Sequence, residues 1–353
     1  MLLVLAAAQA ATVTDLPPFL RGDVTVSYTF DRLGGSLSQH AELGTSDQEV
    51  AQRSVNAHVM HYGAAFGVAP GAALFVDVPH TVYQSVEAQQ WSKMVYDPAT
   101  ETGSYLGTAT EEDVTVARGN GIGGVWIGAK GTPFSELFTS RRNRATLLLD
   151  FAVRTPNDNN WFAIKEASTT GGLGTRGVGP GGVGIQVGGT ASTTQGKVEP
   201  YLSFAYVDNL PVTVNITKDD GTPLWNNCTI DPANTVDASF GAEFVAGQNE
   251  NSGSRTAFDL HLATHWERYS ETPTGLELPG VLQPEAGLVQ KAEALEMGGG
   301  LGVDLRFMKY LELDLFGNAL YRLPQRLESP YPVYTGDDTL HVLAGAKLNI
   351  RVR

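Results

Sequence analysis

The histidines are the residues whose spacing could support metal chemistry. His261 and His265 lie four residues apart. On a β-strand they would share a face but sit roughly 13 Å apart, at about 3.4 Å per residue, which is too far to hold one metal ion. His58 and His61 lie three apart and would point to opposite faces. We therefore expect no metal site and no cofactor.

Two other patterns suggest ligands. Gly172, Gly174 and Gly177 match the dinucleotide fingerprint G-x-G-x-x-G, but no predicted strand precedes them and no helix follows, so a loop is the better interpretation. Carboxylate and asparagine clusters at 157–160, 219–221 and 337–338 are explained by turn formation and solvation. Binding of calcium, or of divalent ions linked to lipopolysaccharide, is the alternative for these clusters.

Composition narrows the class of protein. The formal net charge of -14 excludes nucleic acid as a partner, because no basic surface is available to neutralise phosphates. A single cysteine, Cys228, rules out an internal disulfide. The apolar run from Leu2 to Ala8 and the A-x-A pattern ending at Ala10 predict a signal-peptide remnant over residues 1–10. A buried strand or helix is the alternative for these residues. One exported domain then spans 11–353.

Apolar and polar residues alternate along most of the remaining chain, which predicts β-strands. Val24, Val26, Tyr28 and Phe30, for example, share one face, opposite Asp23 and Thr25. The twelve predicted strands centre on 24–30, 55–68, 74–78, 121–130, 145–154, 183–187, 202–206, 236–244, 258–267, 296–307, 311–322 and 340–352. Many are longer than the five or six residues usual in soluble sheets.

The connections between these strands alternate in length. Long connections are predicted at 31–54, 83–118, 155–181, 208–235, 269–294 and 323–337. Short ones lie near Pro70, at 132–143, at 193–196, at 248–254 and at Met308-Lys309. Long outer loops alternating with short periplasmic turns are typical of bacterial outer-membrane barrels. We predict an all-β fold: a single antiparallel transmembrane β-barrel of about twelve strands in the outer membrane of a Gram-negative cell. A soluble β-sandwich or jelly roll is the alternative.

If the apolar faces contact lipid, the charged residues between them point into the lumen. These candidates are Asp77, Asp150, Asp259, His261, His265, Glu267, Asp304, Arg306, Glu312, Asp314, Arg322, His341, Lys347 and Arg351. They either form a salt-bridged filling or line a path whose charges select solutes. A twelve-stranded barrel is roughly 24 Å across, so side chains would leave about 10 Å or less. The 83–118 segment is long enough to narrow the path further.

The middle of the chain resembles the family of outer-membrane transporters associated with phenol degradation, which is distantly like the long-chain fatty-acid transporters. Gly121–Lys130 is similar to its strand motif G-x-G-D-V-x-L-G-x-K, with Gly124 in place of the aspartate. Phe151–Pro156 and Val198–Leu202 resemble its next strands. The last residues, Ile350–Arg353, lack the terminal aromatic favoured by the barrel-assembly machinery. The resemblance implies uptake of hydrophobic compounds.

We therefore predict a passive channel for small or hydrophobic solutes, not an enzyme. Its partners would be outer-membrane lipid, lipopolysaccharide, the barrel-assembly machinery and a small-molecule solute. The first alternative is a structural or adhesion barrel that uses its outer loops and transports nothing. A barrel enzyme acting on lipid is a weaker alternative, because none of the seven histidines is followed two residues later by serine, the arrangement of outer-membrane phospholipases.

Overall fold

The computed structural model describes residues 16–39, 48–90, 92–97, 102–108, 114–134, 144–157, 164–165, 173–217, 223–249, 251–273, 288–328 and 333–352. The predicted signal-peptide remnant lies outside these residues. All the regular elements among them are β-strands. No helix in this part of the chain is long and apolar enough to cross a membrane.

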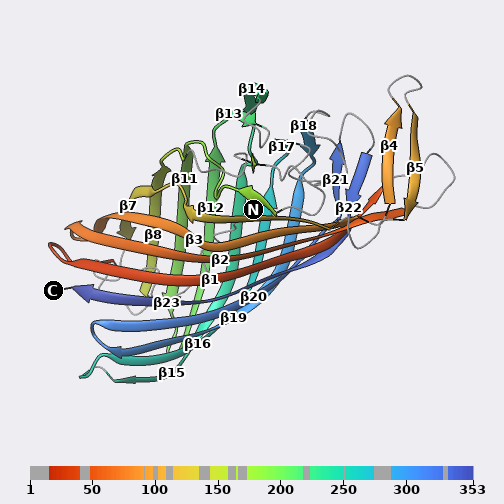
Figure 1. Cartoon of the computed structure of the whole chain (residues 1–353). Coiled ribbons are helices and arrows are strands. Elements are labelled where there is room, and N and C mark those ends of the chain that lie inside the picture. Colours follow the sequence, from red (N-terminus) through yellow and green to blue (C-terminus); the bar gives the residue numbers. More distant parts are fainter. Residues whose placement is uncertain are drawn as a thin grey trace.

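Twelve wall positions form a closed antiparallel barrel (Figure 1). In order around the wall they are β1 (Gly22–Gln39), β2 (Gln48–Ala69), β3 (Ala72–Gln90), β6 (Val114–Ile122) with β7 (Trp126–Phe134), β8 (Arg144–Arg154), β11 (Gly184–Thr194), β12 (Val198–Asn209), β15 (Thr235–Asn249), β16 (Ser254–Glu267), β19 (Ala294–Met308), β20 (Leu311–Arg322) and β23 (Thr339–Val352). β23 pairs with β1 from Gly22–Val352 to Leu33–His341, which closes the barrel. The predicted twelve-stranded barrel is confirmed.

The outside of the wall is apolar. Leu262, Leu301 and Phe240 are 68%, 66% and 60% exposed, and many other large apolar side chains share this outward orientation. Their neighbours one residue away, such as His261 and Ala263, are buried on the inward face. Closure pairs every wall strand on both sides, so no backbone edge faces lipid. This combination is the architecture of a membrane-spanning barrel.

The fourth wall position is broken, which corrects the prediction of one strand over 121–130. β6 ends at Ile122 and β7 begins at Trp126. Ile122 and Ile127 are both exposed although they lie an odd number of positions apart, so the alternation shifts by one. Pro79 of β3 lies opposite the break and has no N–H to continue the ladder. Its carbonyl instead accepts a hydrogen bond from the Gly123 N–H at 2.8 Å.

The two ends of the barrel differ. Short turns at one end hold Gly71, Gly196 and Gly253, whose positive φ angles of 74°, 70° and 71° favour glycine. The start of β1 at Gly22 and the end of β23 at Val352 both lie at this end, which is the periplasmic end in such barrels. Shorter strands follow the wall strands at the other end (Figure 1): β4 (Ser92–Asp97), β5 (Thr102–Thr108), β9 (Ile164–Lys165), β10 (Leu173–Arg176), β13 (Val212–Thr217), β14 (Pro223–Ile230), β17 (Ser270–Pro273), β18 (Leu288–Lys291), β21 (Gln325–Glu328) and β22 (Val333–Gly336).

These shorter strands correct the prediction of irregular outer loops. β1 continues to Gln39 and β2 starts at Gln48, inside the predicted 31–54 loop. In the predicted 83–118 loop, β3 and β6 extend the wall, and β4 pairs with β5 in a hairpin that projects beyond the end of the barrel in Figure 1. The alternation fades in such extensions because their outward faces no longer contact lipid, whereas the backbone pairing continues.

Candidate functional site

The interior of the barrel gathers all fourteen of the predicted lumen residues. Eight of them are buried: His261, His265, Glu267, Asp304, Glu312, Asp314, Arg322 and His341. The other six are partly buried: Asp77, Asp150, Asp259, Arg306, Lys347 and Arg351. Their positions follow from strand parity, because residues two apart on a strand point to the same face. Whether they select a solute stays a prediction.

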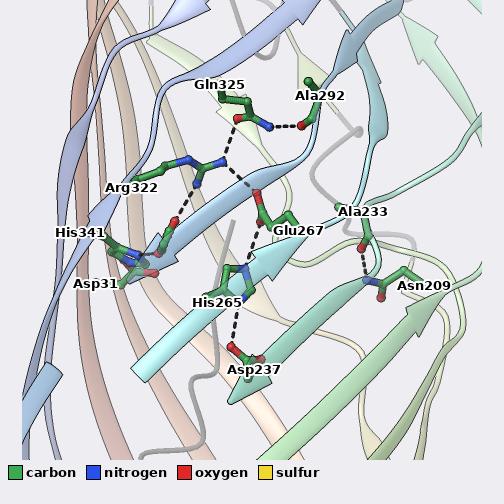
Figure 2. Close-up of polar contacts among 11 residues, drawn as sticks. Asp31, Asn209, Ala233, Asp237, His265, Glu267, Ala292, Arg322, Gln325 and His341 are labelled. Carbon is green, nitrogen blue, oxygen red and sulfur yellow. Dashed lines mark hydrogen bonds and ion pairs between the residues drawn. The ribbon is translucent and has the colours of Figure 1, made fainter. Parts of the chain in front are cut away.

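A continuous row of polar contacts crosses six adjacent wall strands (Figure 2). In order, it joins Asp237, His265, Glu267, Arg322, Glu296, His341 and Asp31. The successive N–O distances are 2.7, 3.5, 2.8, 2.9, 2.7 and 2.7 Å. We call these seven residues the polar row. It ties β15, β16, β19, β20, β23 and β1 together on the side nearer the outer loops.

Two contacts of the polar row join strands that are not neighbours in the wall. Arg322 of β20 binds Glu267 of β16, and His341 of β23 binds Glu296 of β19. Arg322 also donates to Gln325, whose amide donates to the carbonyl of Ala292 (Figure 2). Each of these contacts bridges one intervening strand, so the polar row covers the inner surface of this part of the wall.

A second polar group lies near the middle of β16. The Tyr201 hydroxyl donates to Asp259 at 2.9 Å, Asp259 contacts His261 at 2.5 Å, and the other ring nitrogen of His261 contacts Asn318 at 2.8 Å. Glycine makes this packing feasible. A Cβ on Gly300 would lie 1.8 Å from the Asn318 side-chain oxygen and 2.6 Å from His261 Nε2. The absence of a side chain at Gly300 therefore leaves the room in which these polar groups meet.

The third group, nearer the periplasmic end, is acidic. Arg255 donates to Glu199, Glu243 and Asp304 at 2.8, 2.5 and 2.6 Å. Asp304, Glu312 and Asp314 each place a carboxylate oxygen within 4.8 Å of the others. We call these three the carboxylate triad. Arg306 lies 3.5 Å from Glu312, and Lys347 lies 3.9 Å from Asp314.

The opposite wall, formed by β2, β3, β7, β8 and β11, has fewer charged contacts. His61 contacts Asp77 at 2.9 Å, and Gln186 donates to Asp150 at 2.8 Å. Asp77, Asp150, Gln186 and Lys130 are all partly exposed, in contrast to the polar row, in which Glu296, His265 and His341 are at most 1% exposed. Water therefore reaches the inward face of this wall more readily than it reaches the polar row.

Several interior charges were not among the sequence candidates. These are Asp23, Asp31, Arg53, Lys130, Arg154, Glu199, Asp237, Glu243, Arg255 and Glu296. The alternation of faces along a strand would have identified some of them. Glu296 lies an even number of residues from Asp304 on β19, and Asp31 an even number from Asp23 on β1, so each pair shares a face. Asp31 was assigned to a loop, and Arg255 lay next to a predicted turn, because the predicted strands were too short.

By sequence, the chain matches no known protein family and no well-characterised protein. Its structure is similar to the COG4313 outer membrane channel from Pseudomonas putida F1 (9% identity, TM-score 0.47, covering 98% of this chain and 99% of that one). It is also similar to a Pseudomonas aeruginosa FadL homologue (11%, 0.39, covering 94% and 90%) and to the outer membrane protease OmpT from Escherichia coli (10%, 0.33, covering 94% and 96%).

Similarity at this level concerns the fold, and we draw no functional argument from it. The structure itself defines the class: a twelve-stranded barrel of the outer-membrane type, with an apolar exterior and a polar, charged interior. The predicted relation to transporters associated with phenol degradation extends no further than this class.

Proposed function

We propose that the protein is a passive channel for small solutes across the outer membrane, and that it favours cations over anions. The observation that carries the proposal is the interior itself: charged and polar side chains lie on the inward faces from the periplasmic end to the outer end, among buried apolar residues such as Leu320 and Leu343. An apolar interior or a barrel filled with aliphatic side chains would leave no polar path.

The preference for cations follows from the excess of interior carboxylates. Inward-facing acids are Asp23, Asp31, Asp77, Asp150, Glu199, Asp237, Glu243, Asp259, Glu267, Glu296, Asp304, Glu312 and Asp314. Inward-facing bases are Arg53, Lys130, Arg154, Arg255, Arg306, Arg322, Lys347 and Arg351. In a narrow interior with low-dielectric walls, an excess of one charge concentrates the opposite ion.

We place the path along β3, β7, β8 and β11. There the inward carboxylates Asp77 and Asp150 are partly exposed, whereas the polar row occupies the other half of the interior. Gly128 and Gly188 have no side chains that would project from this wall into the interior. The Phe75 ring and the Asp150 carboxylate occupy the space that a Cβ at these positions would need. A solute that passes along this wall therefore disrupts fewer hydrogen bonds and ion pairs between side chains than one that passes along the polar row.

Single-channel recording in planar bilayers tests the proposal. With a KCl gradient, the reversal potential should have the sign of a cation-selective pore. Asp77→Asn with Asp150→Asn should shift it toward zero, because two path-lining charges are removed, while Glu293→Gln, an exposed residue outside the barrel strands, should not. Folding of each variant is checked by heat-modifiable migration on gels.

A folded protein that conducts no ions and passes no labelled solute into vesicles would contradict the channel and favour the structural or adhesion barrel. An anion-selective pore would retain the channel but contradict the role given to the carboxylates. In this proposal lipid and lipopolysaccharide surround the apolar exterior, and the barrel-assembly machinery inserts the protein into the outer membrane.

A further inference from the structure

The carboxylate triad brings three acidic side chains together in a buried place. Asp304 and Asp314 are directly paired across β19 and β20, and Glu312 lies two residues before Asp314 on the same face. Like charges directly opposite each other destabilise a sheet unless something compensates them. The structure therefore needs a source of positive charge at this point.

Buried oxygen atoms of two triad residues, Glu312 and Asp304, remain without hydrogen bonds among the described residues. Oε1 of Glu312 and Oδ1 of Asp304 are buried and accept no hydrogen bond, and the two side chains are 6% and 8% exposed. A buried carboxylate oxygen without a donor is costly, because it has lost its hydration without replacement. These atoms are candidate ligands for a bound cation.

Neighbouring side chains supply only part of the compensating charge. Arg255 carries one positive charge, yet it is shared by Glu199, Glu243 and Asp304. Arg306 is 3.5 Å from Glu312 and Lys347 is 3.9 Å from Asp314. Both distances are longer than a well-formed charged hydrogen bond of roughly 2.7–2.9 Å.

We infer that the carboxylate triad of Asp304, Glu312 and Asp314 binds one divalent hard cation, with calcium preferred. All three donors are carboxylate oxygens, which Ca²⁺ and Mg²⁺ bind in preference to softer metals. Donors on opposite sides of one Ca²⁺ are about 4.6–5.2 Å apart, and those around Mg²⁺ about 4.0–4.2 Å. The donors here lie within 4.8 Å of one another, so one divalent ion can reach all three. Calcium is preferred because it accepts several protein carboxylates, whereas Mg²⁺ usually keeps several waters and binds through one or two carboxylates.

This site differs from the sequence prediction, which expected no metal. The prediction considered histidine pairs and loop clusters, whereas the triad forms only when β19 and β20 pair in this register. The inference depends on the barrel fold and not on conduction. Calcium binding and channel activity can therefore be tested independently of each other.

Calcium binding by the refolded full-length barrel in detergent tests the inference. Refolding from inclusion bodies removes lipopolysaccharide, whose own divalent ions would otherwise be counted. After chelator treatment, equilibrium dialysis with radioactive Ca²⁺ should give one ion per chain, displaced only weakly by Mg²⁺. Calcium should also raise the midpoint of thermal unfolding of the wild type, because the ion binds the folded state.

Glu312→Gln should weaken calcium binding by at least roughly tenfold, because it removes one charged ligand at nearly constant volume. Asp237→Asn is the matched control: it alters an inward carboxylate outside the triad and should bind calcium like the wild type. A folded wild-type barrel that takes up no Ca²⁺ at millimolar concentration would overturn the site, as would unchanged affinity in a folded Glu312→Gln. If Glu312→Gln does not fold, the wild-type stoichiometry and thermal shift decide alone.

Discussion

Arg322 offers the sharpest test of how the interior is held together. Its side chain is 9% exposed, and its guanidinium donates to Glu296 at 2.9 Å and to Glu267 at 2.8 Å. Both carboxylates are essentially buried, at 0% and 2% exposure. Arg322→Met preserves much of the side-chain volume but removes the charge. It therefore leaves two buried carboxylates without their shared cation.

The expected loss in unfolding free energy is about 3–5 kcal/mol, the range for breaking a buried ion pair by removing one partner. Most of this cost is the burial of uncompensated charge. Adding Glu267→Gln and Glu296→Gln to Arg322→Met should therefore recover part of it. Arg268→Met, at an exposed position just after β16, should change stability by no more than about 0.5 kcal/mol.

Urea unfolding in lipid vesicles, followed by tryptophan fluorescence and by loss of heat-modifiable migration, measures these differences. An Arg322→Met barrel as stable as the wild type would refute the reasoning, because it would mean that water or rearrangement compensates the two carboxylates. Recovery in the triple variant, in contrast, separates a charge effect from a loss of packing.

Two further predictions concern other parts of the molecule. Gly300→Ala should destabilise the barrel by roughly 1–3 kcal/mol, because its Cβ would overlap the Asn318 side chain and the Gly317 carbonyl. Gly247→Ala is the control, because its Cβ would meet nothing within 4 Å. Equal stability of the two variants would contradict this account. Cys228, on the β13–β14 hairpin at the outer-loop end, should react with a membrane-impermeant maleimide on intact cells. Burial raises the pKa of its thiol, so labelling should accelerate as the pH rises. Protection from the reagent in intact but not lysed cells would place this end of the barrel in the periplasm.

Hydrophobic alternation predicted the wall because it reports contact with lipid. Leu301 and Val303 of β19 alternate with Gly300, Gly302 and Asp304, and this period is visible in the sequence. Where strands leave the lipid, both faces can be polar, so the continuation of β1 to Gln39 gives no such signal.

The contacts inside the barrel were not predictable in the same way. Alternation places Arg322, Glu296 and Glu267 on inward faces. Which of them meet depends on the stagger between neighbouring strands and on contacts between strands that are not neighbours. The sequence also fails to reveal the shift between Ile122 and Trp126, because glycine satisfies the pattern on either face.

The contact between His341 and Asp31 joins residues 310 positions apart in the chain. It forms only when β23 meets β1, the last pairing that closes the wall. The polar row is thus completed by closure itself, and a barrel closed in a register shifted by two residues would bury charges opposite the wrong partners. The interior in this way acts as a check on assembly: the correctly closed barrel is the arrangement in which these buried charges find one another, whatever solute the protein handles afterwards.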